Sequence, residues 1–199
     1  MARPRSFNTD EVVEQLCDYF WKHGYSDTSL DNLAQELQIK RGSLFNAFGS
    51  KENLINAAYG RYGQKFKLRF KTIELGVPAI AHYFKNAVKS AITDSAGKGC
   101  FLVNLLMSSE FPTPELHQLA EQDMVLLRDF FEKHLNQARL DGQLAAEISI
   151  SSGIDILLGV TVGIFALARI QGTSTMIQEF ADNNLRGLFG ISFLSSPES

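Results

Sequence analysis

A short polar segment, residues 40–46, holds side chains that suit contacts with double-stranded DNA. Asparagine bonds adenine through two atoms, serine bonds several base edges, and lysine or arginine binds guanine or phosphate. A helix in this segment would carry Arg41, Ser43 and Asn46 on its outward side, with Lys40 in the preceding turn. The segment therefore predicts a helix that reads DNA.

Flanking residues add groups that suit the sugar-phosphate backbone of the duplex. Lys51 begins the next predicted helix, where free backbone N–H groups and an ammonium can hold one phosphate together. Arg3 and Arg5 form a basic arm that can lie along the backbone or in the minor groove. Gly42 leaves room for close approach to the groove wall, and Phe45 can pack against a sugar. The predicted DNA-binding residues are Arg3, Arg5, Thr28, Lys40, Arg41, Gly42, Ser43, Phe45, Asn46 and Lys51.

The elements that must position these residues have the lengths and spacing of a helix-turn-helix. Residues 28–48 predict a short helix capped by Ser29, a tight connection and a second helix over 41–48. A preceding helix, capped by Thr9 and ended by Gly24, supports the pair. The shared core is expected from the apolar residues Leu33, Ala34, Leu37, Ile39, Leu44 and Phe48.

The rest of the chain follows the three-to-four spacing of amphipathic helices, without a strand pattern. Ser50 caps a long helix that runs from Lys51 to about Thr72. Further helices are predicted at Pro78–Asp94, Cys100–Glu110, Pro114–Asp141, Ser151–Gln171 and Ser174–Phe189. The sequence thus predicts an all-α protein with a three-helix helix-turn-helix domain at 1–50. A helical domain at 51–199 follows, and the helix from Lys51 connects the two.

The charge balance alone does not indicate a nucleic-acid partner. The net charge is −3, and residues 1–60 contain six Lys or Arg against eight Asp or Glu. The prediction of DNA binding therefore depends on where the cations lie, because their number gives no basic field.

Cysteine usage and the apolar runs of the sequence indicate the cellular compartment of the protein. Cys17 and Cys100 match no zinc-site spacing, and neither a metal nor a cofactor is predicted. The most apolar run, Ile154–Ile170, contains Asp155 and Arg169 and is shorter than the roughly 20 residues a bilayer requires. It predicts a buried helix. We expect no signal peptide, because no apolar stretch of about 7–15 residues follows Arg3 and Arg5. We therefore expect a cytoplasmic protein with no membrane partner.

The stretch Ala2–Leu54 contains RPRSF, FWKHGYSDTSLDNLAQEL and IKRGSLFNAFGSKENL, and it strongly resembles the DNA-binding domain of the TetR/AcrR repressor family. The resemblance covers about the first quarter of the chain, and the rest matches in length and in its layout of long helices. Three positions depart from the family pattern. Gln38 stands where glycine is frequent, Phe45 where a phosphate-binding tyrosine is usual, and Ala47 where histidine is frequent.

The resemblance implies a homodimer held by the last two long helices, and the residues support it. Apolar side chains nearly encircle the helix predicted at 151–171, which is too much for one buried stripe. Gly159 and Gly163 permit close helix contact. The alternative is a buried helix of a monomer. The predicted interface residues are Ile154, Leu157, Leu158, Thr161, Phe165, Ile177, Phe180 and Leu188.

The resemblance also implies a pocket for an unidentified small-molecule effector among the middle helices. Aromatic and methionine side chains there can line an apolar cavity, although at helical spacing most of them are expected to be core. His82, Asn104 and His117 are the polar candidates for orienting a ligand. The predicted pocket residues are Tyr62, Phe66, Tyr83, Cys100, Asn104, Met107, Phe111, His117 and Met124.

Cys100 has two interpretations. It follows Gly97-Lys98-Gly99 and opens a predicted helix, where the helix dipole and Lys98 favour the thiolate. The stretch GCFLVNLL also resembles a segment in electrophile-sensing members of the family, in which cysteine modification lowers DNA affinity. The alternative is a small buried apolar residue, which is also the interpretation of Cys17.

These patterns together predict a ligand-responsive, DNA-binding transcriptional regulator. The family likeness favours a repressor that leaves its operator when a small molecule binds or a thiol is modified. Two recognition helices would enter successive major grooves about 34 Å apart, and the effector would move the helix that begins at Lys51. The alternative is a helical small-molecule-binding protein or enzyme that no longer binds DNA. The sequence contains none of the common catalytic motifs, so we do not expect an enzyme.

Overall fold

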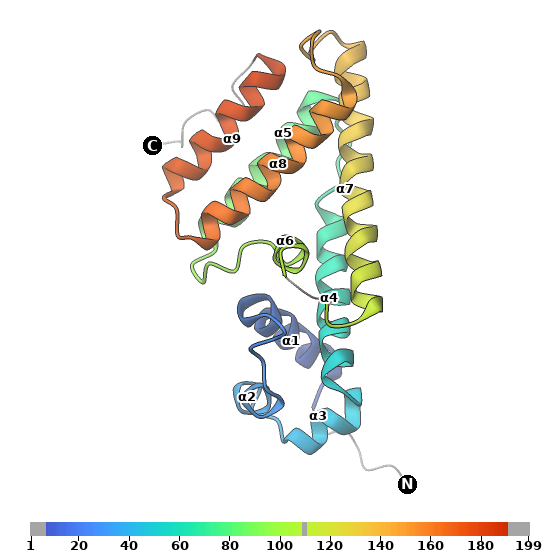
Figure 1. Ribbon diagram of the computed structural model, residues 1–199, viewed down its shortest axis with the longest axis vertical. Coiled ribbons are helices and arrows are strands. Elements are labelled where there is room, and N and C mark those ends of the chain that lie inside the picture. The colour runs from blue at the N-terminus through green and yellow to red at the C-terminus, as the bar shows by residue number, and fades with distance from the viewer. Residues whose placement is uncertain (1–6, 109–110, 191–199) are drawn as a thin grey trace. The chain divides into compact units, whose positions relative to one another are not determined.

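A computed structural model of the 199-residue chain describes residues 7–108 and 111–190. Within these ranges the secondary structure is helical and contains no strand (Figure 1), which confirms the predicted all-α class. The helices are α1 (Thr9–His23), α2 (Leu30–Glu36), α3 (Arg41–Phe48), α4 (Lys51–Leu68), α5 (Val77–Thr93), α6 (Phe101–Leu106), α7 (Pro114–Leu140), α8 (Ile150–Arg169) and α9 (Ser174–Phe189).

Helix ends in the N-terminal part follow local capping chemistry. The cap of α1 is Asn8, whose side chain accepts a hydrogen bond from a first-turn N–H, and Thr9 is the first helical residue. The prediction of a Thr9 cap was therefore wrong by one residue, because asparagine caps at least as well as threonine. Gly24 ends α1 at a φ of 76°, as predicted. Ser29 and Ser50 accept first-turn N–H bonds at α2 and α4, as predicted.

Two helices are shorter than the sequence predicts. α4 ends at Leu68 and not at Thr72, because the N–H of Phe70 bonds the carbonyl three residues back and tightens the chain into a turn. α6 ends at Leu106, whereas the prediction extended it to Glu110, which lies outside the described residues.

The chain divides into two compact units. The first consists of the described residues within Met1–Phe66 and Cys100–Gln122, and the second of those within Lys67–Gly99 and Asp123–Ser199. Helices α4 and α7 each contribute residues to both units. The predicted functional domains, 1–50 and 51–199, stay a prediction.

The first unit has an aromatic core shared by α1, α4 and α6. The ring centroids of Trp21 and Tyr62 lie 5.2 Å apart, and those of Tyr59 and Tyr62 each lie 5.5 Å from Phe101. Edge-to-face pairs at these distances add to the hydrophobic gain of burying the rings. This cluster ties the first part of α4 to α1.

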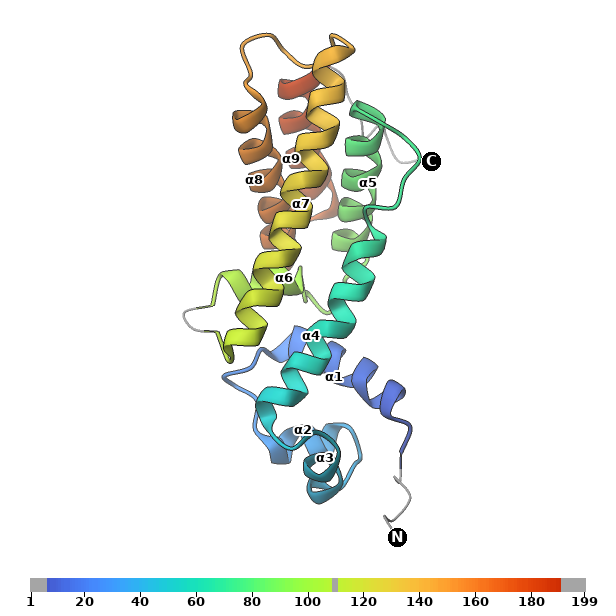
Figure 2. The same cartoon turned by 90° about the vertical axis from the view of Figure 1, so that its right-hand side faces the viewer.

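The second unit combines an aromatic core with an apolar helical layer. Tyr83 and Phe84 of α5 meet Phe130 and Phe131 of α7, with ring centroids between 5.1 and 5.8 Å apart. α8 and α9 lie side by side, and each also contacts α5 (Figure 2). Gly163 of α8 allows this approach, since a Cβ there would lie 2.5 Å from the ring of Phe180.

Most of the predicted dimer-interface residues are buried within one protomer, and the interface stays a prediction. Leu158 and Phe180 keep part of their surface exposed. The other six are at most 5 % exposed within one protomer, because α8 and α9 pack against each other and against α5 on the side where these residues lie. These core residues are Ile154, Leu157, Thr161, Phe165, Ile177 and Leu188.

α8 is long and apolar enough to cross a membrane by composition alone. Its most apolar window has a mean hydropathy of 2.0, and 39 % of that window is buried. A core helix passes the same test, and α8 packs against α5 and α9. We therefore interpret α8 as a core helix with one uncovered face.

Candidate nucleic-acid interface

Helices α2 and α3 form the predicted helix-turn-helix. Their contact is apolar, and it gives the eight-residue α3 the tertiary support that so short a helix needs. Of the six predicted core residues, four are buried and two are half-buried. The buried ones are Leu33, Ala34, Leu37 and Leu44, and the half-buried ones are Ile39 and Phe48.

The turn between these helices uses a residue other than glycine in the left-handed region. Gln38 has a φ of 54°. Its N–H donates to the carbonyl of Gln35 at 3.1 Å, and the N–H of Ile39 donates to the carbonyl of Ala34 at 3.0 Å. These two bonds are those of a Schellman motif, so they satisfy carbonyls that the end of α2 leaves open. The turn therefore forms without the glycine that is frequent in the resembled family.

The outward side of α3 is exposed and rich in groups that can bond DNA. Gly42 and Asn46 are exposed, Ser43 is half-buried, and Phe45 is 60 % exposed. Among the described residues, the side chains of Lys40, Ser43 and Asn46 have no hydrogen-bond or ion-pair partner. We name the side chains of Lys40, Arg41, Ser43, Phe45, Asn46 and Lys51 the α3 surface.

Arg41, the first residue of α3, is paired with Asp31 of α2. The Nη1 atom of Arg41 lies 3.0 and 3.1 Å from the two carboxylate oxygens of Asp31. Sequence reasoning missed Asp31, because an acidic residue in the first turn of a helix has a sufficient explanation in the helix dipole.

The N-terminus of α4 is built around Lys51. Its Nζ lies 4.0 Å from the centroid of the Tyr25 ring, and the Tyr25 hydroxyl donates to Glu52 Oε1 at 2.8 Å. Burial, followed by the hydrogen bond to Glu52 and its charge, raises the pKa of Tyr25 to about 12. Burial lowers the pKa of Lys51, against the opposing effect of Glu52. The ammonium is thus held over the Tyr25 ring, on the residue at which α4 begins.

Apart from Gly42, which has no side chain, three predicted contact residues fall outside this surface or outside the described residues. Thr28 is 3 % exposed, and its hydroxyl donates to the carbonyl of Gly24 at 2.7 Å. We therefore remove Thr28 from the predicted set, because its side chain supports the chain before α2. Arg3 and Arg5 lie outside the described residues.

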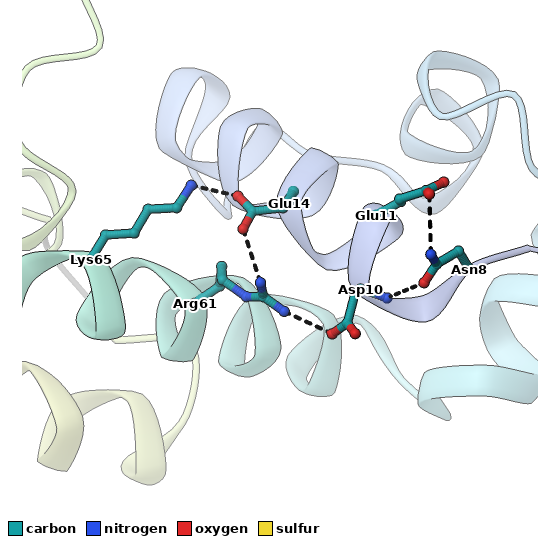
Figure 3. A network of polar contacts seen from close by, with 6 residues as sticks. All are labelled: Asn8, Asp10, Glu11, Glu14, Arg61 and Lys65. Carbon is teal, nitrogen blue, oxygen red and sulfur yellow. Dashed lines mark hydrogen bonds and ion pairs between the residues drawn. The ribbon is translucent and has the colours of Figure 1, made fainter.

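A polar network between α1 and α4 offsets much of the acidity of α1 (Figure 3). Arg61 of α4 reaches Asp10 at 2.8 Å through Nη2 and Glu14 at 3.0 Å through Nη1. Lys65 also pairs with Glu14, and this hydrogen bond raises the pKa of Lys65. The charge count over residues 1–60 missed this pairing, because both cations lie beyond residue 60. The acids of α1 are therefore partly neutralised from α4.

Comparison with known proteins agrees with this arrangement. The model of bacterial regulatory proteins of the tetR family matches residues 13–58, and the tetracyclin repressor-like C-terminal domain matches residues 76–183. The second match alone covers more than half of the chain. This protein belongs to the tetR family. The resemblance noted in the sequence is thereby confirmed, and the chain is a DNA-binding transcriptional regulator of that family.

Individual tetR-family relatives align over nearly the whole chain. The HTH-type transcriptional repressor ComR of Escherichia coli (strain K12) is 22 % identical, with coverage of 93 % of this chain and 90 % of its own. The uncharacterized HTH-type transcriptional regulator YezE of Bacillus subtilis (strain 168) is 26 % identical, with coverage of 93 % and 98 %.

Solved tetR-family structures share the fold. A cysteine mutant of CifR complexed with operator DNA has a TM-score of 0.76 at 24 % identity, covering 94 % of this chain and 100 % of its own. AibR in complex with isovaleryl coenzyme A and operator DNA has a TM-score of 0.70 at 20 % identity, covering 90 % and 97 %. Since the relatives are regulators, the family membership argues against the enzyme alternative.

The predicted effector residues of this tetR-family chain belong to both units. Tyr83 and Met124 lie in the second unit, and the other seven lie in the first. Met107 is 76 % exposed and His117 is also exposed, with its ring centroid 4.6 Å from that of Phe111. Met107 and His117 are thus placed at the surface, and Asn104 is half-buried. The pocket stays a prediction.

Cys100 is a buried residue at the start of α6. It is 2 % exposed, and its Sγ lies 2.9 Å from the hydroxyl oxygen of Tyr62, within the aromatic core of the first unit. Cys17 is equally buried. Among the described residues no group of three or more His, Cys, Asp or Glu is arranged to hold a metal ion.

Proposed function

We propose that this protein is a cytoplasmic, homodimeric repressor that binds operator DNA through the α3 surface and is released by a small molecule. The observation that carries the proposal is the exposed outward side of α3, whose Ser43 and Asn46 have no partner among the described residues. An unsatisfied polar face on the second helix of a helix-turn-helix is what base reading requires. The name of ComR, a transcriptional repressor, supports repression over activation.

Roles within the α3 surface follow from the chemistry of each group. Lys51, at the open N-terminus of α4, suits a phosphate, and Asn46 suits a base edge. Phe45 lacks a hydroxyl and can offer only packing against a sugar or the backbone.

An electrophoretic mobility shift with the protein's own upstream DNA tests these roles. Lys51→Ala should weaken binding to all duplexes and reduce the slope of log affinity against log salt by about 0.9. Asn46→Ala should lose discrimination at particular bases, at a cost of about 1 to 3 kcal/mol against the preferred site. Lys89→Ala, on the exposed side of α5, removes the same charge and should change neither quantity. No salt-sensitive binding to any promoter fragment would overturn the proposal.

The homodimer is proposed to form through the uncovered faces of α8 and α9. Gly159 and Ala166 of α8 are exposed, Val162 between them is half-buried, and no atom lies within 4 Å of a Cβ built at Gly159. An apolar helix of which only 39 % is buried in the protomer has surface left for a second copy.

Sedimentation velocity tests the dimer face. Gly159→Arg should raise the dimer dissociation constant at least about tenfold and weaken operator binding with it, because a charge would be buried in an apolar interface. The control is His82→Arg on the exposed side of α5, which should leave the dimer intact. A Gly159→Arg protein that remains dimeric would show that another face is used.

Release is proposed to act through the first unit, where Cys100 and Tyr62 lie in one core. The structure of AibR in complex with isovaleryl coenzyme A and operator DNA supports a small molecule as the effector, because a protein with this fold binds one. The 2.9 Å contact between Cys100 and Tyr62 favours a second route, since an adduct on Sγ would displace the Tyr62 hydroxyl.

A thermal-shift screen of candidate effectors, followed by release of labelled operator, tests the first route. Treatment with an alkylating reagent tests the second, with Cys100→Ser as control. Release by the reagent that is lost in Cys100→Ser would support thiol modification. Equal release, or none, in both proteins would identify Cys100 as a core residue.

A further inference from the structure

We propose that Asp31 is a positioning residue for sequence discrimination, because it holds the guanidinium of Arg41 toward a base edge and away from the phosphate backbone. This inference rests on the proposed use of the α3 surface. Arg41 stands at the start of α3 and Asp31 in the first turn of α2, so the pair joins the two helices of the motif.

The pair of Arg41 and Asp31 contributes little to folding. The side chains of Arg41 and Asp31 are 61 % and 72 % exposed. Exposed ion pairs of this kind contribute little to stability, because water screens both charges. The main effect of the pair is therefore on the orientation of the Arg41 side chain.

The contact with Asp31 leaves one edge of the Arg41 guanidinium available. Only Nη1 touches Asp31, at 3.0 and 3.1 Å. The Nε and Nη2 atoms of Arg41 have no partner among the described residues. Two N–H groups on one edge are what bonding to the O6 and N7 atoms of guanine requires.

The negative charge of Asp31 changes which part of a duplex Arg41 favours. A free arginine adds to binding of any duplex, because each neutralised phosphate releases counterions. A carboxylate 3.0 Å from the guanidinium repels a phosphate that approaches the same site. A base edge has no net charge, so the pair disfavours the phosphate far more than the base. Asp31 thereby lowers non-specific affinity and raises the ratio of specific to non-specific binding.

The chain offers a matched control for this idea on the same helix. Glu36, the last residue of α2, is exposed, and its side chain has no partner among the described residues. Asp31→Asn and Glu36→Gln remove the same charge from one helix, but only the first removes the ion pair with Arg41.

The test measures dissociation constants for two duplexes of equal length over a series of salt concentrations. One duplex is enriched by the wild-type protein from a randomised pool, and the other has random sequence. Asp31→Asn should bind the random duplex about three to ten times more tightly. Its salt slope should grow by about 0.9, since Arg41 then reaches a phosphate. The ratio of affinities should fall by a similar factor, and Glu36→Gln should keep the wild-type ratio and slope.

A double-mutant cycle with Arg41→Ala ties the effect to Arg41. In the Arg41→Ala background, Asp31→Asn should change the ratio less than about twofold. An Asp31→Asn protein that behaves like Glu36→Gln would overturn the inference, as would an effect that persists without Arg41. A wild-type protein that enriches no duplex would overturn the proposed function and this inference with it. Circular dichroism of each variant checks that the fold is kept.

Discussion

The α3 surface of the first unit and helix α8 of the second differ in solvent exposure. The residues predicted to bind DNA are mostly exposed on α3, whereas most of those predicted for the dimer interface on α8 are buried. On α3 the polar side chains face water, and only Leu44 of the helix is buried. On α8 eight residues are buried, among them Leu157 and Ile164 at 0 % exposure, and the other residues of the helix keep part of their surface exposed. Substitutions on α3 should therefore change DNA binding with little effect on folding, and substitutions on the inner face of α8 should change folding first.

The largest expected effect lies between α8 and α9. Gly163→Ala should lower the free energy of unfolding by about 1 to 3 kcal/mol, because the new Cβ would lie 2.5 Å from the ring of Phe180. Gly159→Ala, one turn away in open space, should leave it unchanged or raise it by up to about 1 kcal/mol through helix propensity. Urea unfolding of both variants measures this difference, and equal effects would contradict the close packing.

A smaller effect of opposite sign is expected at the turn of the first unit. Gln38→Gly should raise the free energy of unfolding by about 1 kcal/mol, because glycine adopts a φ of 54° without the penalty of a Cβ. Gln35→Gly, within α2, should lower it by a similar amount. Thermal unfolding distinguishes the two, and a Gln38→Gly protein that is less stable than the wild type would argue against the left-handed turn.

The ion pairs of the two units should also differ in how much they contribute to the free energy of unfolding. Arg61→Met in the first unit should lower the free energy of unfolding by up to about 1 kcal/mol at low salt, since two acids lose their partner. High salt should reduce this loss by screening. Arg128→Met in the second unit loses one exposed pair at 3.5 Å and should show almost no change. Denaturant unfolding at two salt concentrations checks both expectations.

The smallest expected effect is a pH dependence in the second unit. His134 is 3 % exposed, and burial, followed by the charge of Lys133, lowers its pKa below the ordinary 6.5. Below pH 6.5 the unfolded chain takes up a proton that the folded protein does not, so stability falls as the pH drops toward the folded pKa. His134→Leu should remove this part of the dependence, which begins near the ordinary pKa of 6.5 and extends below it. His82→Leu, at an exposed site, should leave it in place.

Local chemistry made much of the fold predictable. Side chains within a few residues of a helix boundary determine where the helix begins or ends. Examples are the caps Ser29 and Ser50, the stop at Gly24 and the range of α3. The cap of α1 was misplaced by one residue, because Asn8 and Thr9 both have the chemistry of a cap.

The candidate site was predictable only in part. Its exposed polar residues follow from helical periodicity, since a polar side chain on the outer face of a short helix is solvated by water. Asp31 and Arg61 were not predictable, because their partners lie on other helices. The buried position of Thr28 also depends on packing around α2.

By itself the sequence determined the helical class, most helix ends, the helix-turn-helix segment and the family, since each depends on local spacing and residue type. Only the tertiary structure decided which apolar residues of α8 and α9 are core and which remain for a partner. An apolar residue such as Leu157 gains the same free energy under any apolar cover. The sequence therefore shows that it must be covered, and the packing of α5, α8 and α9 decides by what.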